Sequence, residues 1–166
     1  MRSTEDVVGD NKPIWIRTPK CAGTSMMRIL KHKPIRIVKF GEVEKCKKNT
    51  INFNEAYKFA FVRNPFDRCV SSWRYSLKNR WFGGNFNQFV ESKFCDRTFL
   101  SLTRHLSLDP LDLKIDYLDF IGKVENIQED FNIVCDKIGI SKQKLPHRNR
   151  TKHKHYTEYY DDETRQ

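Results

Sequence analysis

The segment FAFVRNPFDRCVSSW, residues 59–73, is the most informative part of this chain. Its first four residues are apolar, as in a strand that is buried on both faces of a parallel sheet. Asn64 suits the N-cap of a helix, Pro65 its first position, and Asp67 the acidic position of a capping box. Apolar residues then recur at helical spacing and predict a core-facing stripe: Phe66, Val70, Trp73 and Leu77. The segment therefore predicts a buried strand followed at once by a capped helix.

The same alternation extends in both directions from this segment. Further strands are expected at residues 14–18, 35–40 and 119–124, and further helices at 24–32, 85–94, 98–106 and 126–138. Gly139 follows the last of these helices and is expected to end it. Strands that alternate with helices predict an α/β fold with a mainly parallel sheet flanked by helices. In such folds ligands bind at the carboxyl ends of the strands.

Length and composition describe one globular domain over residues 1–166. Hydrophobic residues make up 38% of the chain and aromatic residues 13%, which excludes a disordered chain. No apolar run is long enough to span a membrane, and the first residues lack the apolar core of a signal peptide. Five cysteines without a CxxC pair fit neither a disulfide framework nor a zinc ribbon. We therefore expect reduced thiols and a cytoplasmic protein.

The charge of the chain is strongly basic. Lys and Arg number 31 against 21 Asp and Glu, which gives a net charge of +10. Such an excess favours nucleotides, sulfated or phosphorylated substrates, nucleic acid or a membrane surface, although a merely solvated basic surface has the same composition. Residues 141–157 concentrate this charge, with six Lys or Arg, three His and no acid.

The loop TPKCAGTS, residues 18–25, follows the first expected strand. It combines a lysine, small residues that let backbone N–H groups approach a ligand, and two hydroxyls at a helix start. These are the groups that hold a phosphate. It is not a Walker A sequence, because the lysine precedes the glycine. The alternative is an ordinary strand-to-helix turn with Thr24 as the N-cap.

A second anion site is predicted after the strand at residues 59–62. Arg63 stands at the strand end beside a helix N-terminus, and Ser71 lies two turns into that helix. The alternative is that Arg63 simply pairs with a surface carboxylate.

Both loops resemble a known family. Residues 16–25, IRTPKCAGTS, look like the 5′-phosphosulfate loop of sulfotransferases that use 3′-phosphoadenosine 5′-phosphosulfate (PAPS). Residues 59–73 resemble their 3′-phosphate motif, R-N-P-x-D-R-x-x-S. The carbohydrate-type branch, sulfotransferase family 2, is the most similar, and it is also matched at residues 120–126, 130–131, 145–149 and 155–156. The likeness runs from about residue 14 to the end and is weakest between about 78 and 115.

The resemblance implies a PAPS-dependent sulfotransferase with a P-loop-like core. It would move a sulfuryl group from PAPS to a hydroxyl or amine of a carbohydrate or small molecule, leave PAP as the product, and need no metal. The 5′-phosphosulfate would be held by the first loop: Lys20, Cys21, Ala22, Gly23, Thr24 and Ser25. Arg63 and Ser71 would hold the 3′-phosphate. The basic stretch at 141–157 would fold over the cofactor, with Lys154 or Tyr156 touching it.

Two catalytic residues are expected. Lys20 would neutralise charge that develops on the leaving phosphate. Glu42 follows the strand at 35–40 and stands 21 residues before Arg63, where relatives tend to carry a catalytic His or Glu. The alternative is a solvated loop carboxylate, with His105 and His32 as the next candidates for the base. Many relatives carry their base as a His between residues 33 and 60, where this chain has none. Relatives also continue into a terminal helix beyond residue 165, so we expect a truncated or naturally minimal chain.

Two other functions are weighed against this one. A basic nucleic-acid-binding module fits the charge and the tyrosines near the end of the chain, but it leaves both loops unexplained. A cysteine-dependent phosphatase would use Cys21, whose loop favours a thiolate, but six residues separate Cys21 from Arg28 where that motif has five. A metal site built from His147, His153 and His155 is not expected, because cations flank it and no carboxylate is near.

Overall fold

The computed structural model describes residues 11–39, 41–50, 52–92, 102–108, 114–146, 154–162 and 164. Their strands are β1 (Ile14–Arg17), β2 (Arg36–Lys39), β3 (Lys58–Val62) and β4 (Phe120–Lys123). Their α-helices are α1 (Gly23–Leu30), α2 (Val43–Asn49), α3 (Pro65–Lys78), α4 (Phe86–Val90), α6 (Leu102–Leu106) and α7 (Ile127–Lys137). Two short 3₁₀ helices are η2 (Val124–Asn126) and η3 (Tyr156–Glu158).

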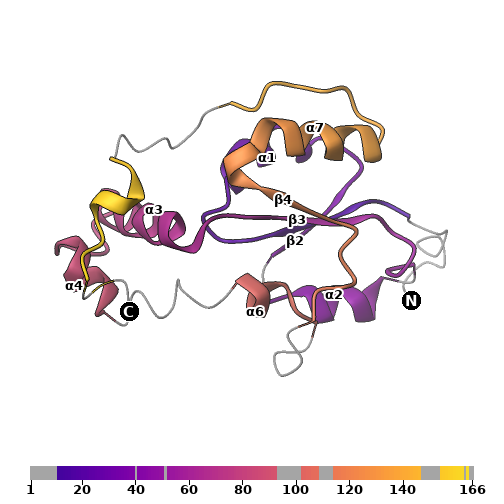
Figure 1. Cartoon of the computed structure of the whole chain (residues 1–166). Coiled ribbons are helices and arrows are strands. Elements are labelled where there is room, and N and C mark those ends of the chain that lie inside the picture. Colours follow the sequence, from indigo (N-terminus) through magenta and orange to yellow (C-terminus); the bar gives the residue numbers. More distant parts are fainter. Residues whose placement is uncertain are drawn as a thin grey trace.

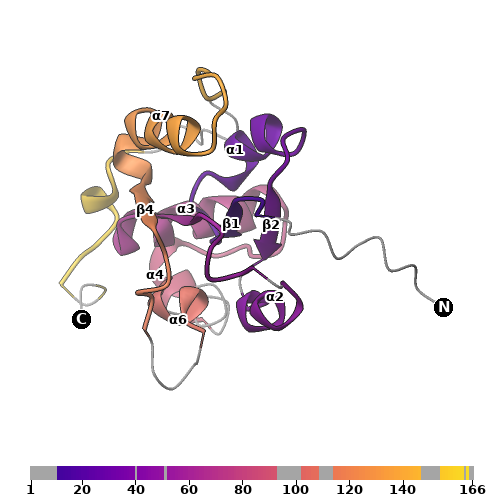
Figure 2. The ribbon, with the colours of Figure 1, turned by 90° about the vertical axis from the view of Figure 1, so that its right-hand side faces the viewer.

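The strands form one parallel sheet in the order β2-β1-β3-β4. Helices α1 and α7 cover one face of the sheet, and α2 and α6 lie on the other (Figures 1 and 2). The predicted α/β architecture is therefore confirmed. Strand β2 pairs with one edge of β1, and the next strand along the chain, β3, pairs with the other edge. The direction in which strands are added therefore reverses between β1 and β3. Ligands bind outside the carboxyl ends of the strands at such a reversal.

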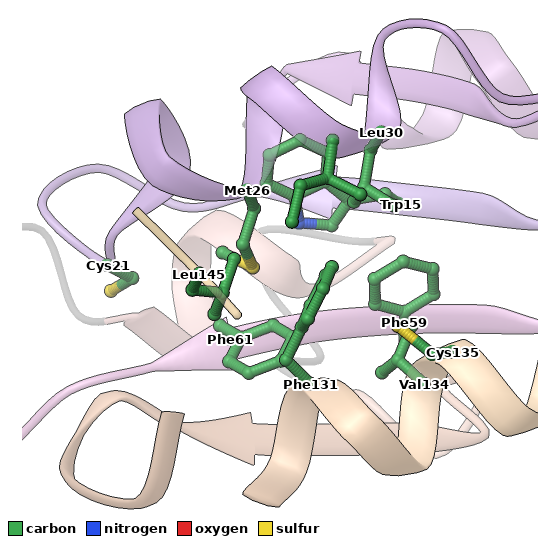
Figure 3. Packing of buried hydrophobic residues seen from close by; sticks show 11 residues of the cluster. Trp15, Cys21, Met26, Leu30, Phe59, Phe61, Phe131, Val134, Cys135 and Leu145 are labelled. Atoms are coloured by element: carbon green, nitrogen blue, oxygen red, sulfur yellow. The ribbon is translucent and has the colours of Figure 1, made fainter. Parts of the chain in front are cut away.

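The larger core lies between the sheet and the α1–α7 layer. Trp15 and Phe59 project from the strands and meet Leu30 of α1 and Phe131 of α7, and all four side chains are almost completely buried (Figure 3). Phe61 fills the space that Gly122 leaves open on the neighbouring strand, since a Cβ at Gly122 would come within 2.5 Å of the Phe61 ring. This packing fixes the carboxyl ends of β1, β3 and β4 relative to one another.

Local signals predicted these elements well. The four strands and helices α1 and α7 lie within two residues of the expected bounds, α3 begins at Pro65 as expected, and Gly139 adopts the left-handed conformation expected of a helix stop (φ 71°). Helix α4 is shorter than the segment expected at 85–94, whose last two residues lie outside the described ones. Residues 98–101 of the segment expected at 98–106 also lie outside them.

The predicted core-facing stripe of α3 is confirmed only in part. Val70 is fully buried and Trp73 packs against the same cluster, but Phe66 is 43% exposed, and the buried face of the helix also carries Arg68, Cys69 and Ser72. The reason is the direction of α3, which extends beyond the carboxyl edge of the sheet and packs against α4 and the end of the chain instead of the strands (Figure 1). The stripe of α7 is confirmed, with Phe131 and Val134 fully buried.

Candidate functional site

The loop after β1 has a strained backbone. Lys20 and Ala22 both adopt positive φ angles, 61° and 56°, which non-glycine residues rarely do. Ala22 is the N-cap of α1, so the helix begins at Gly23 and the expected N-cap role of Thr24 is wrong. Alanine has no side-chain acceptor, and no side chain caps this helix. No side chain of the cap therefore competes with an anion for the first amides of α1, and the backbone N–H of Ser25 donates to the carbonyl of Ala22 at 3.0 Å.

The two hydroxyls of this loop have different surroundings. Thr24 is exposed, whereas Ser25 is buried in the first turn of α1. A cation that the sequence reasoning did not assign to the site also lies here. The guanidinium of Arg17 rests against Gly23, where an added Cβ would come within 3.3 Å of its Nε atom. Arg17 therefore adds positive charge beside the N-terminus of α1.

The loop after β3 is capped as predicted, but its acid plays another part. The side chain of Asn64 accepts hydrogen bonds from the backbone N–H groups of Phe66 (3.0 Å) and Asp67 (3.3 Å). Asp67 does not complete the predicted capping box. Its carboxylate is paired with Arg63, and the backbone N–H of Asn64 instead donates to Glu125 Oε1 at 2.6 Å. Glu125 follows β4, so the ends of β3 and β4 meet at this point.

Hydrogen bonds join the loops after β1 and β3. Arg63 Nη1 donates to the backbone carbonyl of Lys20 at 3.3 Å. The hydroxyl of Thr18 donates to the carbonyl of Phe61 across the same gap. The two predicted anion loops therefore form one continuous surface at the point where the strand order reverses.

The side chain of Lys20 turns toward α3. Its ammonium lies 3.8 Å from the centroid of the Tyr75 ring. Burial, together with the positive charge of Arg63, lowers the pKa of Lys20 from 10.5 to about 8, while Cys21 acts in the opposite direction. Tyr75 was not predicted to belong to the site. It stands four residues after Ser71, so the two share one face of α3, and Ser71 is half-buried there.

Cys21 is an inert thiol in this structure. Its side chain is 1% exposed and packs in the main core beside Met26 and Leu145 (Figure 3). Its Sγ atom donates to the carbonyl of Pro19 at 3.3 Å. Burial raises the pKa of Cys21, and the nearby guanidinium groups do not offset that effect. The thiolate that a cysteine-dependent phosphatase needs is therefore disfavoured, which argues against that alternative.

The chain after α7 returns to the carboxyl edge of the sheet. Lys142 pairs with Asp136 at 2.9 Å near the end of α7, and the backbone N–H of Leu145 donates to Gln128 Oε1 at 2.9 Å near its beginning. Leu145 is buried against the core residues next to Cys21. This return brings residues 141–146, the described beginning of the basic stretch predicted at 141–157, toward the side of the sheet where the two loops lie.

Residues 154–162, called here the C-terminal segment, pack on α3 and α4 (Figure 1). The ring of Tyr156 stacks on Phe66 with centroids 6.4 Å apart, and the hydroxyl of Tyr160 donates to the carbonyl of Phe66 at 3.0 Å. Tyr156 therefore lies at the beginning of α3, the helix that starts two residues after Arg63. Lys154 is exposed and pairs with Glu158 at 3.3 Å.

The candidate bases occupy different places. Glu42 is exposed, directly precedes α2, and follows β2 at the same sheet edge as the two loops. His32 lies between the end of α1 and the beginning of β2, which is the opposite edge, so the topology disfavours it. His105 belongs to α6, and its side chain lies outside the described part of the structure.

Within the residues that the structure describes, no three His, Cys, Asp or Glu side chains gather in a way that would hold a metal ion. His147 and His153 are outside those residues, and His155 contacts Thr157, with 2.8 Å between Nδ1 and Oγ1. None of the described helices has the length and apolar character that crossing a bilayer requires.

Comparison with known proteins adds three findings. A family model described as "Sulfotransferase family" matches residues 5–166. An uncharacterized protein of Archaeoglobus fulgidus is 34% identical over 86 residues, which is 51% of this chain and 69% of that protein. A crystal structure of a sulfotransferase from Alicyclobacillus acidocaldarius is similar over 82% of this chain and 64% of that one, with 14% identity and a TM-score of 0.44.

Proposed function

Because the chain belongs to the sulfotransferase family, we propose that it transfers a sulfuryl group from PAPS to a hydroxyl or amine of a carbohydrate or small molecule. The observation that supports this most strongly is the hydrogen bond from Arg63 to the carbonyl of Lys20. It joins a helix N-terminus without a side-chain cap to a second cationic helix start. A cofactor with two separated anionic groups needs this pair of sites, and a basic nucleic-acid-binding module does not.

The residues present fit such a cofactor. The 5′-phosphosulfate would be held by Lys20 and by the residues that lead into and open α1: Cys21, Ala22, Gly23, Thr24 and Ser25. Lys20 and the guanidinium of Arg17 supply positive charge there. The 3′-phosphate would be held by Arg63 and by Ser71 on α3. Lys154 and Tyr156 would contact the cofactor from the C-terminal segment, which lies against the beginning of the same helix.

PAPS, when bound, supplies an activated sulfuryl group whose leaving group is a phosphate. The ammonium of Lys20 and the amides of the α1 N-terminus would then both stabilise negative charge that develops on the leaving oxygen. The partial burial of Lys20 would strengthen this effect, because the same burial that lowers the pKa of Lys20 also weakens solvent screening. No metal is required in this scheme.

Glu42 is proposed as the general base that accepts the proton of the acceptor. Its exposure suits a group that must meet an acceptor arriving from solvent, and it follows β2, the strand next to β1. His105 remains the reserve candidate.

The proposed compartment is the cytoplasm, which is supported by the reduced thiols of Cys21, Cys46, Cys69 and Cys135. A native disulfide found by mass spectrometry under non-reducing conditions would contradict it.

Calorimetric titration and thermal unfolding with PAP and with AMP test the proposal. PAP at about 100 times its dissociation constant is expected to add roughly 2.7 kcal/mol to the free energy of unfolding. AMP, which lacks the 3′-phosphate, is expected to add much less. Equal effects of the two nucleotides would show that Arg63 and Ser71 do not form a 3′-phosphate site.

A further inference from the structure

We propose that Tyr75 is a positioning residue for Lys20: the face of its ring seats the Lys20 ammonium beside the first loop. This inference rests on the role proposed for Lys20. The Nζ atom of Lys20 lies 3.8 Å from the centroid of the Tyr75 ring, well inside the roughly 6 Å within which a cation is attracted to the negative face of an aromatic ring. The contact joins the loop after β1 to the third turn of α3.

The ring that forms this seat is itself held in place. The indole of Trp81 packs edge-on against it, with centroids 5.3 Å apart and an angle of 78° between the planes. The chain folds back to make this contact: the backbone N–H of Trp81 donates to the carbonyl of Ser76 at 2.9 Å, and Arg80 takes a left-handed conformation with φ 57°. Trp81 is 57% exposed. A strained turn therefore brings a largely exposed side chain against the ring that contacts Lys20.

The Tyr75 ring favours the charged form of Lys20, which the surroundings of Lys20 disfavour. Lys20 is half-buried next to the guanidinium of Arg63 and the thiol of Cys21, and both burial and Arg63 favour loss of its proton. A carboxylate in the place of Tyr75 would restore the charge, but it would also compete with an incoming phosphate for the ammonium. A ring stabilises the charged form and leaves the N–H donors available to a ligand.

The position of Tyr75 directs this effect to the proposed cofactor site. Tyr75 and Ser71 are one turn apart on the same face of α3, so the seat holds Lys20 over the helix that would bind the 3′-phosphate. Lys20 is thereby restrained between the two anion loops instead of extending into solvent. Restraint of a long, flexible side chain before binding lowers the entropy cost of the complex.

The test uses Tyr75→Leu, which removes the ring, and Tyr75→Phe, which keeps it. The matched control is Tyr57→Leu, because Tyr57 is also a partly buried tyrosine stacked on an aromatic ring, that of Phe59 at 6.0 Å, but at the opposite end of β3. The first measurement is the NMR titration of the Lys20 side chain, with ¹³C-labelled lysine and no ligand, assigned with Lys20→Met. Tyr75→Leu is expected to lower the titration midpoint by about 0.7 pH unit, the equivalent of roughly a fivefold change. Tyr75→Phe and Tyr57→Leu are expected to leave it in place.

The second measurement is PAP affinity at neutral pH. Tyr75→Leu is expected to weaken it roughly fivefold, and Tyr75→Phe to restore it. Trp81→Leu, a change at a largely exposed side chain, is expected to act in the same direction and replaces Tyr75→Leu if that variant fails to fold. A Lys20 midpoint that does not move when the ring is removed or loosened would overturn the seat. A midpoint that moves in a protein that does not bind PAP would uphold the seat and overturn the proposed function.

Discussion

The Nε atom of Arg63 donates a 2.7 Å hydrogen bond to Oδ2 of Asp67, one turn into α3. Both side chains are mostly buried, at 16% and 22% exposure. Together with the bond from Nη1 to the carbonyl of Lys20, this contact fixes the plane of the guanidinium at the end of β3. Arg63 therefore has a structural partner as well as the ligand proposed for it, and the two roles can be separated by mutation.

Arg63→Ala and Asp67→Asn are expected to differ in ligand preference. Both remove the ion pair, and each is expected to lower the free energy of unfolding by about 1 kcal/mol, because the pair is partly buried near a helix N-terminus. Only Arg63→Ala removes the cation, so it alone is expected to abolish the preference for PAP over AMP in calorimetry. Equal loss of that preference in both variants would make Arg63 a purely structural residue.

The titration of Lys20 is expected to change stability and PAP affinity in opposite directions as the pH rises. The pKa of Lys20 is about 8 in the folded protein against an ordinary value of 10.5. Between these values the unfolded chain keeps a proton that the folded protein has lost, so the contribution of Lys20 to stability rises with pH. PAP affinity should fall over the same range, because the ammonium loses its charge.

Thermal unfolding and PAP titration across this pH range check the prediction. The rise in stability is expected to be absent in Lys20→Met, and PAP affinity at neutral pH should be roughly 10- to 100-fold lower than in the wild type. Lys31→Met, at the exposed end of α1, is the control. A pH dependence identical in Lys20→Met and the wild type would show that Lys20 is not the titrating group.

Glu42→Gln tests the general base. The substitution keeps the shape of the side chain and removes its basicity, so turnover should fall at least about 100-fold while PAP affinity is preserved. Glu44→Gln is the matched control, since Glu44 is an exposed acid two residues later that pairs with Lys48 at 2.6 Å. Near-normal turnover of Glu42→Gln with an accepted substrate would transfer the role to His105.

Cys21 is expected to react slowly with alkylating agents. Its thiol is buried and its pKa is raised, so little thiolate is present at neutral pH. Cys46 is only half-buried and should be modified about tenfold faster by iodoacetamide, as measured by peptide mass spectrometry. Cys21→Ala should cause only a modest loss of transferase activity. Rapid labelling of Cys21 with complete loss of activity would show that its thiol takes part in catalysis.

The elements predicted correctly are those whose signals are local. Short apolar runs mark the four strands, and the side chain of Asn64 caps α3 as its type and position indicate. Helix α2 was not predicted, because its sequence VEKCKKN carries no apolar stripe and buries only Val43. Phe66 of α3 was expected to face the core. It packs instead against Tyr156 and Tyr160, which come from the far end of the chain.

The same division applies to the candidate site. Lys20 and Arg63 stand in loops whose composition signals an anion site, and the structure brings them together. Tyr75, Glu125 and Arg17 carry no such signal. Tyr75 meets Lys20 only because α3 extends past the sheet edge, and Glu125 meets Asn64 only because β4 pairs with β3. Contacts that depend on topology cannot be deduced from the residues on either side.

The strand order also determines when in folding this site can exist. Strand β1 meets its first neighbour, β2, within a short local unit, but its other edge stays open until β3 inserts, and only then do Thr18 and Phe61, 43 positions apart, come into contact. Parallel pairings over such separations form slowly. An anion that requires both Lys20 and Arg63 therefore reports the pairing of β1 with β3, and its capture during refolding would mark a step that follows the formation of α1 and β2.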